Sequence, residues 1–148
     1  MSELGKFLEY AQAFEKTYVD DDWERLEQYF APDAVYRVVG STAWDCEVKG
    51  RRELLAAMRK FVNEFDRKCT RTIRPGGAPH VGEDSVRVAG IAAYTRGDSD
   101  ELALEIELIA QYRDGKIVRL SDVYPASSEA RMKAWLEKWG AGLAPSYV

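Results

Sequence analysis

Asp122 is the residue whose sequence neighbours make it the strongest candidate for acid–base chemistry. It lies in an alternating run, Leu102 to Pro125, that is interrupted by the dipeptide Asp114-Gly115. Asp-Gly between two alternating runs is a strong short-range signal for a β-hairpin. A carboxylate on an apolar sheet face is costly unless it is paired, hydrogen-bonded or protonated. Asp122 is therefore a candidate general acid or base.

The face that carries Asp122 depends on the register of this hairpin. A two-residue loop, Asp114-Gly115, places Asp122 opposite Glu107. A three-residue loop that also includes Arg113 places Asp122 opposite Ile106. The three-residue loop pairs Leu108 with Leu120, Leu104 with Tyr124 and Ala110 with Val118. We therefore predict the three-residue loop, with Asp122 as the one charged side chain on an apolar inner face.

Composition limits the classes of function. The chain has 148 residues, of which 46% are hydrophobic and 31% are charged, as in a single globular domain spanning 1–148. A net charge of −4 with interspersed signs argues against nucleic-acid binding. No run reaches the length of a membrane span, and the first residues do not resemble a signal peptide, so we expect a cytoplasmic protein. One histidine and two separated cysteines, Cys46 and Cys69, predict free thiols and neither metal nor cofactor.

Hydrophobic periodicity predicts the order of the elements. Helices are expected at 4–18, 23–29 and 51–65, and a last helix at 128–139 precedes a short tail with no assignable structure. The stripe of the first helix consists of Leu4, Phe7, Leu8, Ala11, Phe14 and Tyr18. The pattern also predicts strands. One is expected at 33–39 and ends in a Gly40-Ser41 turn, one is broken at 75–79, and one at 85–95 precedes the hairpin. We predict an α+β fold, in which a cone-shaped, curved antiparallel sheet wraps around the N-terminal helices.

Small and aromatic residues are expected to shape a cavity in this cone. Gly90 and Ala92 share the inner face of their strand and leave volume for a ligand. Tyr36 and Tyr124 should point the same way as Asp122. Either tyrosine could donate a hydrogen bond to a substrate carbonyl, or each could be a wall residue with its hydroxyl bonded elsewhere.

Three stretches together resemble the SnoaL-like branch of the nuclear-transport-factor-2-like superfamily. They are Asp22-Trp23-x-x-Leu26-x-x-Tyr29-Phe30-Ala31-Pro32-Asp33-Ala34-Val35-Tyr36, then Gly50-Arg51-x-x-Leu54, and then Tyr112-Arg113-Asp114-Gly115-Lys116-Ile117-Val118 with Asp122. The resemblance implies a cone-shaped barrel, a homodimer through the outer sheet face and often an enclosed pocket. The superfamily it points to includes polyketide cyclases, ketosteroid isomerases, epoxide hydrolases and proteins with no known reaction, so the fold alone does not decide function.

The resemblance assigns roles residue by residue. The polar residues of ketosteroid isomerases fall at the apolar Phe14, Val38 and Leu108, so that isomerisation is not expected here. The acid/base aspartate of SnoaL-type cyclases, which follows the hairpin turn, is similar to Asp122. Epoxide hydrolases use an Asp-Arg-Asp set, of which Asp122 alone can be matched.

These observations favour a small, cofactor-independent enzyme of cyclase, isomerase or lyase type that acts on a hydrophobic carbonyl compound. Asp122 would carry the proton. The expected substrate-binding residues are Tyr36, Tyr124, Tyr18, Trp44, Phe14, Val38, Leu108 and Leu120. The alternative is a non-catalytic domain of the same fold that binds a hydrophobic ligand or serves as a dimerisation module, with aromatic side chains packed onto Asp122.

Overall fold

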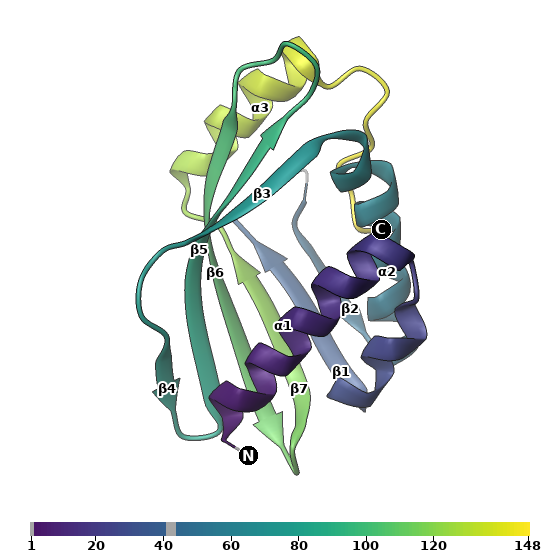
Figure 1. Cartoon of the computed structure of the whole chain (residues 1–148), viewed down its shortest axis with the longest axis vertical. Helices are drawn as coiled ribbons and strands as arrows, with labels where there is room; N and C mark the ends of the chain where they lie inside the picture. Colours follow the sequence, from purple (N-terminus) through teal and green to yellow (C-terminus); the bar gives the residue numbers. More distant parts are fainter. Residues whose placement is uncertain (1, 41–43) are drawn as a thin grey trace.

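A curved sheet is the centre of the molecule (Figure 1). The structure is a computed structural model that describes residues 2–40 and 44–148. The strands are β1 Phe30–Val39, β2 Cys46–Lys49, β3 Thr70–Pro75, β4 His80–Gly82, β5 Ser85–Thr95, β6 Leu102–Arg113 and β7 Lys116–Val123. The helices are α1 Glu3–Asp20, α2 Arg51–Glu64 and α3 Ser127–Trp139, with short 3-10 helices η1 Trp23–Tyr29 and η2 Asp66–Lys68. This arrangement confirms the predicted α+β class.

The sheet is antiparallel except at one pair of strands. Its order is β2-β1-β7-β6-β5-β3, and β4 pairs with the other end of β5. β1 and β7 run parallel, which departs from the fully antiparallel sheet expected from the sequence. The sheet is curved. It does not close into a barrel, because β2 and β3 lie at its opposite edges and do not pair with each other. α1 and α2 lie across one face of the sheet, and α3 lies at the end away from the β6–β7 turn (Figure 1).

Helix α1 packs on the sheet through a face that overlaps the predicted stripe but is rotated from it: Phe7 is buried, and Leu4, Phe14 and Tyr18 are partly buried against the core. Its buried residues are Phe7, Tyr10, Ala13 and Thr17, whereas Leu8 of the predicted stripe is 49% exposed. Both sets have helical spacing, and the sequence does not decide between two overlapping stripes. Tyr10 packs edge-on against Phe30 of β1, with ring centroids 5.4 Å apart. The aromatic contact with β1 therefore fixes the rotation of the helix about its axis.

The β6–β7 hairpin turns through two residues, so the predicted three-residue loop is wrong. Asp114 and Gly115 have φ values of 52° and 78°, as a type I′ turn requires, and Arg113 faces Lys116. A β-bulge then shifts the register, because Gln111 faces Arg119 and Val118 has no partner.

The bulge places Asp122 opposite Leu108 rather than Ile106 or Glu107. It also reverses the alternation of inner and outer faces along β7. Ile117 is buried before the bulge, and Leu120 and Asp122 are buried after it. Asp122 thus lies on the inner face, although the pairing that puts it there differs from the predicted one.

Other segments agree closely with the prediction. β5 has the predicted bounds, and residues 76–79 separate β3 from β4, which both pair with β5. α3 begins one residue before the predicted start of the last helix. Both cysteines are free thiols in the structure. Ser41 of the predicted turn lies outside the described residues.

Gly40 joins β1 to the end of β7. Its φ is +107°, and a Cβ there would lie 1.9 Å from the Tyr124 main-chain oxygen. We predict that Gly40→Ala lowers the free energy of unfolding by about 3 kcal/mol or more, because steric overlap adds to backbone strain. Gly97→Ala is the matched control, since Gly97 has φ +57° and no atom within 4 Å, and it should cost about 1 kcal/mol. Urea unfolding measures both, and equal losses would contradict the proposed close contact.

Candidate active site

Asp122 and Tyr36 form a buried acid–phenol pair on the inner face of the sheet. Tyr36 is 2% exposed and Asp122 is 8% exposed. The Tyr36 hydroxyl donates a hydrogen bond to Asp122 Oδ2, whereas Asp122 Oδ1 is buried and has no hydrogen-bond partner among residues 2–40 and 44–148. The parallel pairing of β1 with β7 brings the two together, since Tyr36 faces Leu120 and Val38 faces Asp122. One carboxyl oxygen is therefore held and the other is unsatisfied.

Burial gives this carboxyl group an unusual proton affinity. Burial raises the pKa of Asp122 to about 7, and the hydrogen bond from Tyr36 acts in the opposite direction. Burial and the charge of Asp122 raise the pKa of Tyr36 well above its ordinary value, so the phenol stays protonated and remains a donor. A carboxyl group that exchanges its proton near neutral pH can act as a general acid or a general base.

Tyr147, which lies in the segment 141–148 after α3, packs against the same pair. Its ring stacks on Phe61 of α2, with centroids 4.2 Å apart and an interplanar angle of 4°. It meets the Tyr36 ring edge-on at 5.4 Å, and the two hydroxyl groups interact. The sequence analysis missed Tyr147, because a single tyrosine in a segment without periodicity carries no signal of burial.

Trp44 and Tyr124 form the aromatic wall next to this pair. Trp44 is fully buried and lies edge-on to Tyr124 at 5.3 Å and to Phe61 at 4.9 Å. Burial and the charge of Asp122 raise the pKa of Tyr124 well above its ordinary value. Trp44 Nε1 is buried and has no hydrogen-bond partner within the described ranges 2–40 and 44–148. These two rings are packed into the core rather than exposed to an open space.

The other predicted binding residues lie at different depths. Val38 and Leu120 are 2% exposed and flank the acid–phenol pair. Leu108 faces Asp122 across the hairpin and is only partly buried against the core. Phe14 lies edge-on to Trp23 at 6.0 Å, in the packing between α1 and η1.

Tyr10 is a second residue that the sequence analysis missed. It is 6% exposed, and burial together with the charge of Asp122 raises its pKa well above the ordinary value. It lies one helical turn before Phe14. Its spacing of three residues from Phe7 was a signal that could have placed it on the inner face.

Tyr18, predicted as a binding residue, belongs to a different cluster. The Arg71 guanidinium lies 4.1 Å from the centre of the Tyr18 ring and forms a 2.7 Å ion pair with Glu15. The cluster includes a second buried acid, Asp66, which is 5% exposed. Burial raises the pKa of Asp66 to about 7, against the opposing effects of the Arg71 charge and a hydrogen bond from Tyr94. Asp66 Oδ1 also has no hydrogen-bond partner among the residues that the structure describes.

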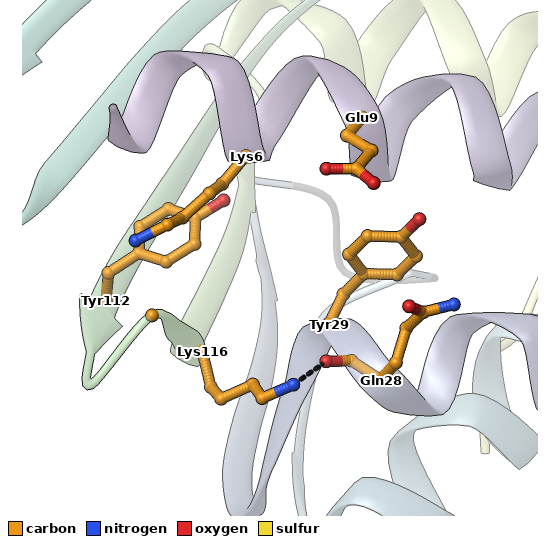
Figure 2. A pocket seen from close by; sticks show the side chains of 7 residues that line it. Lys6, Glu9, Gln28, Tyr29, Tyr112 and Lys116 are labelled. Carbon is orange, nitrogen blue, oxygen red and sulfur yellow. Dashed lines mark hydrogen bonds between the residues drawn. The ribbon is translucent and has the colours of Figure 1, made fainter. Parts of the chain in front are cut away.

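A hollow of about 170 Å³ lies between α1, η1 and the β6–β7 turn (Figure 2). It is lined by Lys6, Glu9, Gln28, Tyr29, Tyr112, Gly115 and Lys116, and Lys116 Nζ donates to the Gln28 carbonyl oxygen. None of the predicted binding residues lines it, and three of its lining side chains, Lys6, Glu9 and Lys116, are charged. This hollow does not suit a hydrophobic ligand.

Neither a metal-binding cluster nor a membrane-spanning helix occurs within residues 2–40 and 44–148. In these ranges, no group of three or more His, Cys, Asp or Glu side chains could hold a metal ion. None of the helices in this part of the chain combines the length and the apolar composition of a membrane span.

The curved, unclosed sheet with α1 and α2 across one face has the same fold as a solved structure described as an NTF2-like protein. A family model described as a SnoaL-like domain matches residues 9–120. The chain therefore belongs to the SnoaL-like family. A search of curated proteins gave no match.

Solved structures agree on the fold. A presumed isomerase from Rhodopseudomonas palustris is 13% identical with a TM-score of 0.70, and the match covers 87% of this chain and 96% of that one. An LEH-like epoxide hydrolase of M. tuberculosis is 14% identical with a TM-score of 0.61, covering 93% and 94%. An NTF2-like protein from Burkholderia xenovorans LB400 is 16% identical with a TM-score of 0.60, covering 86% and 95%. At these identities the similarity establishes the fold alone.

Proposed function

We propose that this protein is a cofactor-independent enzyme of cyclase, isomerase or lyase type, which moves a proton on a hydrophobic carbonyl compound. The observation that carries the proposal is the state of the Asp122 carboxyl group. One of its oxygens accepts a hydrogen bond from Tyr36, and the other is buried and meets no hydrogen-bond partner in the part of the chain that the structure describes. An unsatisfied buried oxygen is costly for stability and calls for an explanation, and a catalytic role is one such explanation.

In the proposed reaction, Asp122 Oδ1 takes a proton from the carbon next to the carbonyl group. The Tyr36 hydroxyl donates to the carboxylate form that takes this proton; after the transfer Asp122 is a neutral acid, and the negative charge lies on the enolate oxygen of the substrate. Because the pKa of Asp122 is raised to about 7, the acid form can return the proton to a different atom. Return to another carbon is an isomerisation, and return to a leaving oxygen is an elimination. Tyr124 is the proposed donor to the carbonyl oxygen.

The comparisons support an enzyme without identifying its reaction. One structural neighbour is described as a presumed isomerase and another as an LEH-like epoxide hydrolase, so proteins described as enzymes share this fold. The epoxide hydrolase alternative is weaker, because it requires an arginine and a second aspartate beside Asp122. Arg71 and Asp66 lie together in the Tyr18 cluster instead, and Asp122 accepts its hydrogen bond from Tyr36.

One observation favours a second candidate function, a non-catalytic domain with a filled interior. Tyr147 packs against Tyr36, and Asp122 is almost fully covered. This is the arrangement expected when aromatic side chains take the place of a ligand. The two candidates differ in whether any substrate can reach the acid.

Hydrogen–deuterium exchange on carbon tests the proposal without requiring the product to be identified. A panel of hydrophobic ketones is incubated with the protein in deuterated buffer, and loss of the hydrogen next to the carbonyl is followed by NMR. We expect exchange of at least one ketone by the natural chain and none above background by Asp122→Asn. Equal exchange with both proteins would contradict the role of Asp122, and no exchange with either would favour the filled domain.

Tyr36→Phe should move the pH dependence of this exchange upward. The Tyr36 hydrogen bond stabilises the charged form of Asp122 and so lowers its pKa. Its removal should raise the pKa above about 7, and the rate that depends on the carboxylate should then rise at higher pH than in the natural chain. Val39→Ala, at a half-buried position of the same strand, serves as the control. An unchanged pH profile would show that the hydrogen bond does not tune the acid.

The remaining expectations stay predictions. A hydrophobic small molecule is the proposed ligand, and neither nucleic acid nor a membrane is a proposed partner. A homodimer through the outer sheet face is supported by the half-exposed apolar residues Ile91, Ile109 and Val123 on that face. A cytoplasmic location is proposed on the sequence pattern alone.

A further inference from the structure

We propose that Tyr147 occupies the ligand position beside Asp122, so that the site takes a flat ring with one oxygen and opens when residues 141–148 move aside. This inference rests on the proposed function for the identity of the site. It adds the class of ligand and names the group that a ligand has to displace.

The surroundings of Tyr147 define a slot for one flat ring. The side chain is 7% exposed. Phe61 covers one face of its ring in a parallel stack at 4.2 Å, and Tyr36 meets it edge-on at 5.4 Å. Stacked and edge-on contacts of this kind favour an aromatic or conjugated ring over a branched aliphatic group of the same volume.

The polar end of the slot is the acid–phenol pair. The Tyr147 hydroxyl interacts with the Tyr36 hydroxyl, which donates to Asp122. A ligand ring in the same slot would therefore place a hydroxyl or carbonyl oxygen against the two groups that can exchange a proton. Tyr147 thus has the shape and polarity expected of a ligand of this site, but it belongs to the chain.

The segment that carries Tyr147 is held less firmly than the sheet and helices around it. Residues 141–148 form neither helix nor strand, and they run from α3 along α2 (Figure 1). Their contacts with α2 and η2 include one main-chain hydrogen bond, from Ala144 to Glu64 at 3.3 Å. Side chains add bonds to main-chain oxygens of the segment: Lys60 donates to Val148 at 2.8 Å, Lys68 donates to Gly142 at 3.3 Å, and Arg96 donates to Ala141. Segments with few backbone hydrogen bonds open at low free-energy cost.

Binding of 2-naphthol, a flat ring system with one hydroxyl group, tests this inference. Calorimetry should give an affinity about tenfold or more higher for Tyr147→Ala than for the natural chain, because the variant has no competing ring. Tyr147→Phe keeps the stacked ring and should bind close to the natural chain. Tyr112→Ala is the matched control, since Tyr112 is also 7% exposed but lines the hollow near the β6–β7 turn, and its affinity should not rise.

Hydrogen exchange by mass spectrometry then reports displacement directly. Saturating 2-naphthol should increase amide exchange in residues 141–148 of the natural chain. Equal affinities for the natural chain and Tyr147→Ala, or no binding to either, would overturn the inference. The outcome is independent of turnover: tight naphthol binding without ketone exchange would overturn the proposed function alone. Ketone exchange that is lost in Asp122→Asn but unaffected by Tyr147→Ala would overturn this inference alone.

Discussion

Asp122→Asn is expected to lower the rate of proton transfer by about 100-fold to 10,000-fold, the usual contribution of a positioned general acid or base. Asparagine has nearly the same shape and can still accept a hydrogen bond from Tyr36, but it cannot take up or release the proton. Ligand affinity should therefore change much less than the rate. Exchange kinetics on the most reactive ketone of the panel and calorimetry on the same protein measure the two quantities separately.

Asp66→Asn is the matched control for this substitution. Asp66 and Asp122 are 5% and 8% exposed, and burial raises the pKa of both to about 7. Both variants thus remove a buried acid of similar proton affinity, but Asp66 interacts with Tyr94 and Arg71 rather than with Tyr36. A comparable loss of rate in Asp66→Asn would mean that the loss reflects structural loosening and not the chemistry of Asp122.

The stability of the fold should fall between about pH 4 and pH 7 as the two buried acids ionise. Each has a folded-state pKa of about 7 and an ordinary value of 3.8, so the folded chain binds more protons than the unfolded chain in this interval. The stabilisation is complete below the ordinary value and is lost as the pH rises through the folded value. Each acid contributes a pH-dependent change of up to about 4 kcal/mol.

Urea unfolding at a series of pH values measures this effect. Because asparagine does not titrate, the difference in unfolding free energy between the natural chain and Asp122→Asn isolates one acid. The natural chain should lose stability relative to the variant as the pH rises from 4 to 8, and the double variant with Asp66→Asn should have the flattest profile. A difference that is constant with pH would show that Asp122 is not protonated at neutral pH in the folded chain.

The amino-acid sequence was sufficient to predict the order of the longer helices and strands, though not β2 or η2, and the inner position of Asp122. Helix α2 and strand β5 follow regular apolar periods, which local spacing alone can reveal. The register of the β6–β7 hairpin could not be predicted in this way, because matching apolar residues assumes an unbroken ladder. The bulge at Val118 adds one residue between the turn and Asp122. The prediction of a loop one residue too long and the missing bulge therefore partly compensated each other, and Asp122 was still placed on the inner face.

The candidate site was only partly predictable for a related reason. Tyr36 and Asp122 could be placed on strands by their alternating neighbours, and the structure joins them through a hydrogen bond. Tyr18 follows the helical period but faces Arg71, since the rotation of α1 is set by packing between elements distant in the sequence. Tyr147 and Asp66 lie in segments without periodicity, where burial depends entirely on tertiary contacts.

The unpaired Val118 has a consequence for comparing this chain with its relatives. Because one additional residue exchanges the interior and exterior sides of the following strand, the number of residues between the turn and the acid matters as much as their identity. A relative that lacks this extra residue would present an aspartate at the same count from its Asp-Gly turn to solvent. Alignments that ignore a single-residue gap here would equate a buried carboxyl group with one that water surrounds.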